Sequence, residues 1–252
     1  MVDRIAVGSL LVMVAGTVLH AETVLQRVAA PYAAVRSVSG EMRRDTPLPG
    51  GATARMLSRV HFERGDRMHV ETTAPLRRRI VCDGVRFRMH LEGEPRGYGV
   101  PVADLPADML GNLRSAPGSP EMALRQLEGV EERPLPASEA FPVRAGYDNG
   151  KTFTVLSLDD QGRLAQIEVF AAADLRQRIA RTVFSAYREV LPGVWFACVQ
   201  KTDAVLQGQE RSETLRIGNL IVNGDLPASL FNPDAFFENI AFVDTLGATR
   251  DP

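Results

Sequence analysis

The chain has 252 residues, of which 45% are hydrophobic and 24% charged, and its formal net charge at pH 7 is -2. This length and composition predict a packed core, in one large β domain or two small ones, and argue against disorder. A net charge so close to zero argues against a nucleic-acid partner, because phosphate binding usually requires a clear basic excess.

The first 21 residues have the pattern of an export signal. Arg4 supplies a positive charge, an apolar run extends from Ile5 to Leu19, and a cleavage site follows Ala21. The run is too short to span a bilayer comfortably, which favours a signal peptide. An uncleaved anchor helix is the alternative interpretation. We expect a cleaved signal peptide (1–21), a single domain (22–245), a tail (246–252) and a periplasmic location.

Apolar spacing predicts a helix within residues 22–34, and alternating apolar and polar residues predict strands after it. The predicted strands cover 35–44, 54–64, 67–73, 77–82, 85–91, 151–160, 164–170, 179–190, 194–205 and 213–222. Between the two groups of strands, the Pro- and Gly-rich segment 92–120 indicates a flexible insertion that holds a helix near 102–113. A further helix is predicted at 120–129.

These elements define a mainly β fold with helices (α+β), built on about 10–11 antiparallel strands. A sheet this wide twists and curls, and its apolar face must be covered. Few helical residues are available as a cover. The predicted architecture is a curled half-barrel under a short helical lid.

Residues 54–91 divide between an apolar and a charged face, which is typical of an antiparallel sheet with one wet side. Asp83-Gly84 is predicted to form a two-residue hairpin turn that places Cys82 opposite Val85. The apolar residues are predicted to line one concavity: Met56, Val60, Phe62, Met68, Val70, Ile80, Val85, Phe87, Met89 and Leu91.

The charged face carries His61, His69 and His90. Three imidazoles could bind zinc, but solvated histidines are far commoner, and we predict no metal site. The arginines at 77–79, 86 and 88 fit a solvated face, with contact to anionic headgroups as the alternative.

The two cysteines, Cys82 and Cys198, are expected to be free buried thiols, although export also permits a disulfide. The sequence contains no nucleophile elbow, phosphate loop or zinc-protease motif. No catalytic residues and no cofactor are therefore predicted.

The order of the motifs resembles the periplasmic outer-membrane lipoprotein carrier and lipoprotein-sorting (LolA/LolB-like) family. One strand ends at Arg64 and Gly65, a second runs to Pro75, and a third reaches the Asp83-Gly84 hairpin. The distal half, with "LPASLFNP" at 226–233 as its most specific piece, is similar to the sorting relatives. The resemblance covers roughly 35–240.

This resemblance implies a half-barrel with an apolar cavity for the acyl chains of a lipoprotein or lipid, and Arg64 as the residue that opens the lid. It implies transport toward the outer membrane, with an inner-membrane donor complex and an outer-membrane acceptor as partners of a monomeric carrier. The alternative is an envelope lipid-sensing or protein-interaction module of the same fold.

Overall fold

The structure is a computed structural model that describes residues 22–206 and 208–245. The predicted signal peptide (1–21) and tail (246–252) lie outside the described residues. The strands are β1 (Ser37–Pro47), β2 (Thr53–Glu63), β3 (Arg67–Ala74), β4 (Arg78–Asp83), β5 (Arg86–Leu91), β6 (Arg96–Pro101), β7 (Glu132–Leu135), β8 (Val143–Asp148), β9 (Phe153–Leu158), β10 (Leu164–Phe170), β11 (Arg178–Leu191), β12 (Val194–Leu206), β13 (Gln209–Val222) and β14 (Ala241–Val243). The helices are α1 (Val24–Ala29), α2 (Ala107–Arg114) and α3 (Glu121–Arg125), with the 3₁₀ turns η1 (Ala30–Ala34), η2 (Val102–Asp104), η3 (Ala228–Phe231) and η4 (Pro233–Ala235).

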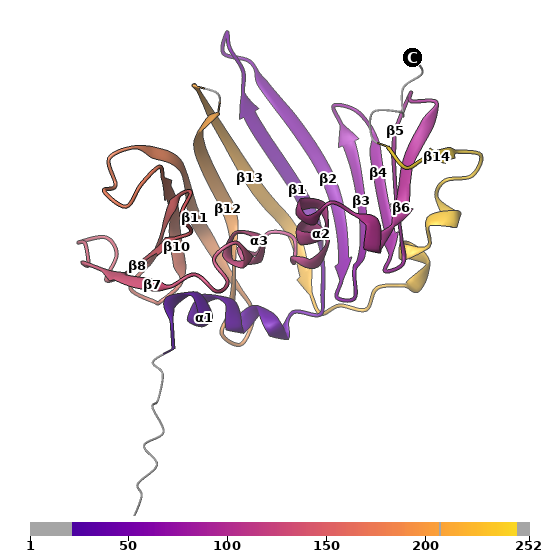
Figure 1. Cartoon of the computed structure of the whole chain (residues 1–252). Helices are drawn as coiled ribbons and strands as arrows, with labels where there is room; N and C mark the ends of the chain where they lie inside the picture. Colours follow the sequence, from indigo (N-terminus) through magenta and orange to yellow (C-terminus); the bar gives the residue numbers. More distant parts are fainter. Residues whose placement is uncertain (1–21, 207, 246–252) are drawn as a thin grey trace, which may run out of the picture.

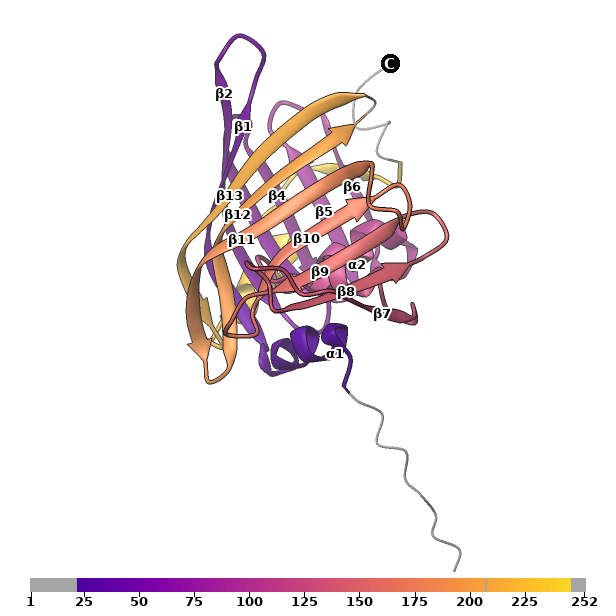
Figure 2. The ribbon, with the colours of Figure 1, turned by 90° about the vertical axis from the view of Figure 1, so that its left-hand side faces the viewer.

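These strands form one sheet in the order β14-β6-β5-β4-β3-β2-β1-β13-β12-β11-β10-β9-β8-β7. Neighbours pair antiparallel, except that β14 pairs parallel with β6. Figures 1 and 2 show the sheet curling into an unclosed half-barrel, with α2 inside its curve. The predicted fold class is confirmed, with 14 strands in place of the expected number of about 10–11.

The additional strands are β6, β7, β8 and β14. The prediction of a flexible insertion over 92–120 is wrong in part, because β6 lies within this segment. In β6, Gly97 and Gly99 lie against the ring of Phe242 on β14. A Cβ atom on Gly97 would come within 2.5 Å of that ring, and one on Gly99 within 2.9 Å. Glycine is required for this close packing, and it removes the apolar alternation that identifies a strand in sequence.

The hairpin between β4 and β5 turns at Gly84 and Val85, so the predicted pairing of Cys82 with Val85 is wrong. Cys82 pairs with Phe87. Gly84 adopts a φ of 93°, and the Asp83 carboxylate accepts the backbone N–H groups of Val85 and Arg86 at 2.9 and 2.7 Å. The register differs from the prediction by two residues, so Cys82 keeps its face, whereas Val85 lies on the turn and is 70% exposed.

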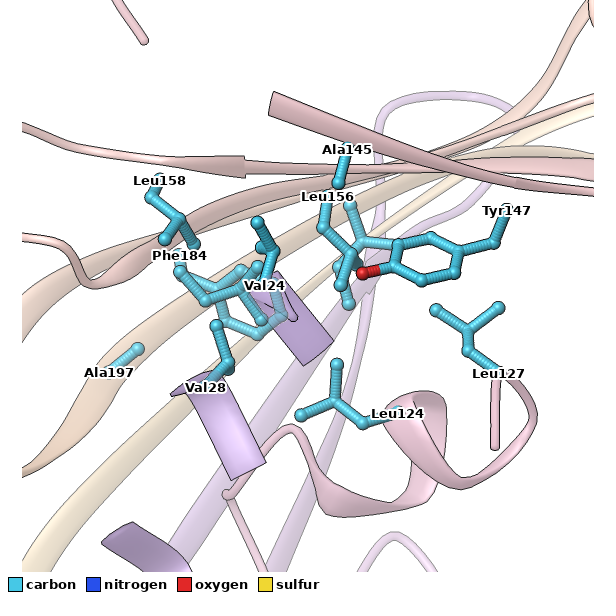
Figure 3. Close-up of a cluster of buried hydrophobic side chains, with 12 residues drawn as sticks. Val24, Val28, Leu124, Leu127, Ala145, Tyr147, Leu156, Leu158, Phe184 and Ala197 are labelled. Atoms are coloured by element: carbon cyan, nitrogen blue, oxygen red, sulfur yellow. The ribbon is translucent and has the colours of Figure 1, made fainter. Parts of the chain in front are cut away.

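Helices and loops cover the concave side in three buried clusters. The α2 cluster contains Cys82, Phe87, Tyr98, Val102, Leu105 and Leu113. The η1 cluster contains Tyr32, Val35, Val38, Phe62, Ala116, Val194, Phe196, Ile217 and Leu220. The α1 cluster (Figure 3) brings Val24 and Val28 of α1 and Leu124 and Leu127 of the α3 region against β8–β12. The segment from η2 to α3 is called the lid below.

The opposite face of β3–β5 is covered by the C-terminal strap, defined as residues 225–243. The ring of Phe236 lies 4.5 Å from that of His69, and Asp234 pairs with Arg86 and Arg88 at 3.0 and 2.8 Å. His69 is only 5% exposed. The prediction of a solvated charged face is therefore wrong here, because the strap supplies both the apolar cover and the counter-charge.

Candidate functional site

The strand register brings most of the predicted lining residues together on the concave face. One row across β2–β5 consists of Phe62, Met68, Cys82 and Phe87, and the next consists of Val60, Val70, Ile80 and Met89. Since side chains alternate along a strand, both rows point to the same side. We call these two rows the apolar face.

Three predicted lining residues lie outside these rows. Leu91 is one row further along, opposite Arg78. Met56 pairs with Arg44 of β1, beyond an irregularity in the β2–β3 register at Leu57. Val85 is on the exposed turn. The centre of the predicted site is thus a continuous surface, whereas its expected periphery is not.

The lid occupies part of the apolar face. Val60, Phe62 and Phe87 are buried, whereas Met68, Val70, Ile80 and Met89 are half-buried. From α2, Leu113, Met109 and Leu110 join the cluster to which Met68, Ile80 and Met89 belong. Methionine suits such a surface, because its unbranched, polarizable side chain repacks around different partners.

Arg64, directly after β2, connects the sheet to three parts of its cover. Its guanidinium donates to the carbonyl oxygens of Val35 and Tyr32 at 2.8 and 2.9 Å, and to Oε1 of Glu121 in α3 at 2.6 Å. A longer bond of 3.4 Å reaches the carbonyl of Arg114 at the end of α2. One side chain therefore holds η1, α2 and α3 at the end of β2.

Other polar contacts fasten the same end of the lid. Arg114 binds Asp66 through Nε and Nη2, each at 3.0 Å. Gln200 of β12 donates to the carbonyl of Gly118 at 2.7 Å. The sequence analysis did not identify Arg114, Asp66, Gln200 or Glu121 as part of the site. The local sequence indicates only a turn at Asp66 and the start of a helix at Glu121. Polar bonds thus hold the lid at its margin, and apolar contacts hold it over the face.

Two ionisable groups at the apolar face, Cys82 and Tyr32, stay in their neutral forms. Burial raises the pKa of the Cys82 thiol to about 11. Burial, and then the nearby Glu121 carboxylate, raise the pKa of Tyr32. Both cysteines are free. Neither the Cys82 thiol nor the Tyr32 phenol therefore adds a charge at neutral pH, which suits an apolar ligand.

On the opposite side of the sheet, two of the three histidines have lowered pKa values and the third is hydrogen-bonded. Burial lowers the pKa of His61, and it lowers that of His69 to about 4. His90 hydrogen-bonds to the carbonyl of Glu94 at 2.9 Å. Within residues 22–206 and 208–245, no group of three His, Cys, Asp or Glu side chains could hold a metal ion.

The described part of the chain has no helix with the length and apolar character needed to cross a membrane. No protein-family model and no curated protein matches the sequence. The fold, however, is shared with several solved structures, and the chain has a LolA-like fold.

One similar structure is a LolA superfamily protein from Nitrosomonas europaea, with 14% identity and a TM-score of 0.51, covering 84% of this chain and 96% of that one. Another is an outer membrane lipoprotein-sorting protein domain from Vibrio parahaemolyticus, with 15% identity, a TM-score of 0.53 and coverage of 83% and 96%. A third is a DUF1329 family protein from Desulfovibrio piger, with 11% identity, a TM-score of 0.55 and coverage of 84% and 95%. At these identities the likeness establishes the fold alone.

Proposed function

We propose that this protein is an exported periplasmic carrier that binds the acyl chains of a lipoprotein or lipid and moves this cargo toward the outer membrane. The observation that carries the proposal is the apolar face of β2–β5 under the apolar side of α2, whose end is fastened by polar bonds. Its likeness in fold to a LolA superfamily protein and to an outer membrane lipoprotein-sorting protein domain supports it. In this proposal the protein is a monomer that has no catalytic activity and no cofactor. It receives the cargo from an inner-membrane donor complex and delivers it to an outer-membrane acceptor.

Binding requires α2 to move, because Met109, Leu110 and Leu113 lie with the residues that the acyl chain would contact. An acyl chain replaces these contacts on the side of the sheet, so opening costs the polar bonds and the exposure of these three side chains. Ten buried methylenes contribute roughly 8 kcal/mol. A hydrogen bond to a charged group contributes about 1.5–3 kcal/mol. A single chain therefore outweighs the bonds that Arg64 makes to the lid.

In this proposal Arg64 is the residue that gates the lid. Its bond to Glu121 holds the lid, its bonds to Tyr32 and Val35 anchor the guanidinium, and the guanidinium lies 5.9 Å from the ring centroid of Phe62 at the edge of the apolar face. Loss of these bonds frees the lid while the two rows of side chains stay in place. Arg64 thus controls access to the site.

The test compares two neighbouring residues of β5 that point to opposite sides of the sheet. Met89→Gln puts a polar group of similar size on the apolar face, and His90→Gln is the matched control on the other face. We expect Met89→Gln to weaken binding of a fluorescent fatty-acyl probe several-fold and His90→Gln to leave it unchanged, with similar melting temperatures.

Native mass spectrometry of protein purified without detergent gives a second measurement, and a co-purifying lipid mass is the expected result. Folded wild-type protein that takes up neither the acyl probe nor a lipidated peptide would overturn the carrier proposal. A protein partner recovered by cross-linking would then favour the sensing or interaction module.

A further inference from the structure

A separate cavity of about 270 Å³ lies between η1, the turn before α3 and the ends of β10–β12. Its floor includes the buried residues Val28, Leu164 and Phe184, and its rim includes the exposed Arg27 and Gly193. Figure 3 shows Val28 and Phe184 in the same buried cluster. None of the residues of the apolar face lines this cavity. It is therefore a second, independent place where a small molecule could be enclosed.

Aromatic rings form much of the wall. Tyr32, Phe184, Tyr187 and Trp195 all line the cavity. The Tyr32 hydroxyl donates to the carbonyl of Trp195 at 2.6 Å, and the Tyr187 hydroxyl donates to the carbonyl of Leu164. The phenol groups are thus already satisfied by the backbone and hold their rings in place. The wall offers preorganised ring surfaces of the kind that recognise flat apolar groups.

Arg163 strengthens this wall without adding net charge. Its guanidinium lies 4.5 Å from the ring centroid of Tyr187 and 5.3 Å from that of Trp195, which is the range of cation–π contacts. Asp159 pairs with the same guanidinium at 2.7 Å. The Arg163–Asp159 pair is therefore a neutral, rigid part of the wall.

Arg27 gives the cavity its unmatched charge. It lies in the last turn of α1, and it has no ion-pair partner within the described part of the chain. The other charged residue of the lining, Arg163, is paired with Asp159, and Glu121 near the cavity is paired with Arg64. A ligand with one negative charge would pair with Arg27.

We propose that this cavity binds a small monoanionic molecule with a ring, such as an aromatic carboxylate, with the ring against Tyr187 and Trp195 and the acid at Arg27. The volume lies just below the roughly 300–1,000 Å³ of sites for drug-sized ligands, so the ligand is small. A complete long acyl chain does not fit the same space. This site uses none of the residues of the proposed carrier site.

Trp195 is the only tryptophan in the chain, so its emission reports on this cavity. The experiment titrates the full chain with 4-phenylbutyrate and with its uncharged amide, exciting at a wavelength that only tryptophan absorbs. We expect a saturable change in Trp195 emission with the acid and weaker binding of the amide. Arg27→Gln should weaken acid binding roughly five-fold, as expected for an exposed ion pair of about 1 kcal/mol.

Arg36→Gln is the matched control, because Arg36 is also exposed and closely follows η1 but does not line the cavity. Equal affinity for the acid and the amide, or equal weakening by Arg27→Gln and Arg36→Gln, would overturn the proposal. So would the absence of a saturable change up to millimolar acid in folded protein.

Two further measurements separate this inference from the carrier proposal. Met89→Gln should leave the Trp195 titration unchanged, because Met89 is on the apolar face. Competition by a long-chain fatty acid for the Trp195 signal would show that the cavity belongs to an acyl site, and would overturn the separate-site proposal. Failure of the acyl probe to bind anywhere would overturn only the carrier proposal.

Discussion

Replacing Arg64 with methionine removes the guanidinium that joins β2 to the lid and keeps a side chain of similar reach. Three strong bonds are lost, to Val35, Tyr32 and Glu121. The Arg64 side chain is 32% exposed and that of Glu121 12%, so each bond contributes at the lower end of its range. Of these three bonds, the one to Glu121 reaches the lid, so roughly 2 kcal/mol of the loss is expected to act on the lid.

Glu121 limits the cost of this change. Its second carboxylate oxygen accepts the backbone N–H of Ala116 at 2.8 Å and the hydroxyl of Ser119 at 3.2 Å. The carboxylate is therefore not stranded when Arg64 is removed. The free energy is expected to appear as easier opening of α2 and α3, with the sheet intact.

Hydrogen exchange with peptide resolution measures this opening. A loss of about 2 kcal/mol should accelerate amide exchange in residues 107–125 by roughly 30-fold, with β9–β12 unchanged. Arg67→Met is the matched control, because Arg67 forms only a surface pair with Glu63. Exchange in 107–125 within three-fold of wild type would refute the reasoning. Uniform acceleration over the whole chain would show that Arg64 supports the fold and not the lid.

Burial, with a smaller contribution from His61, lowers the pKa of His69 to about 4, whereas the unfolded chain has the ordinary value near 6.5. The unfolded state therefore takes up a proton first as pH falls from 6.5 to 4, and the free energy of unfolding decreases by roughly 3 kcal/mol in that window. Urea unfolding at several pH values should show this decrease in the wild type, and His69→Leu should lack the contribution of His69 to it. Tyr147→Phe removes a hydroxyl that donates to Glu132 at 2.5 Å and accepts a backbone N–H of α1, and urea unfolding should show a loss of about 1–3 kcal/mol. Cys82 is buried with a pKa of about 11, so iodoacetamide at pH 8 should leave it unmodified in the folded protein and modify it after denaturation, as mass spectrometry would show.

The sequence predicts the apolar face well because its signal is local. From β2 to β5, alternation and short turns determine which residues share a side, and even a turn shifted by two residues leaves the parity of Cys82 unchanged. The prediction for Val85 is wrong because it also rests on alternation alone. Val85 has the same parity as Phe87 and Met89, but it lies on the turn, where the strand has already ended.

The remaining features depend on contacts between distant segments. Gly97 and Gly99 conceal β6 because their partner, Phe242, lies far along the chain. His69 has the sequence context of a surface residue and is buried only by the strap. Likewise, Arg114 and Gln200 look like ordinary polar residues until the fold brings them to Asp66 and Gly118. Alternation within a strand contains no information about such partners.

An unclosed sheet has two free edges, and unpaired edge strands recruit other chains. At one edge, the three residues of β14 shorten the available ladder and cover β6. At the other edge, β7 has only four residues, Glu132–Leu135, and includes charged side chains and Pro134. Proline cannot donate to a ladder, and short charged strands pair poorly with neighbours. The half-barrel can therefore stay open to a guest without becoming a template for aggregation.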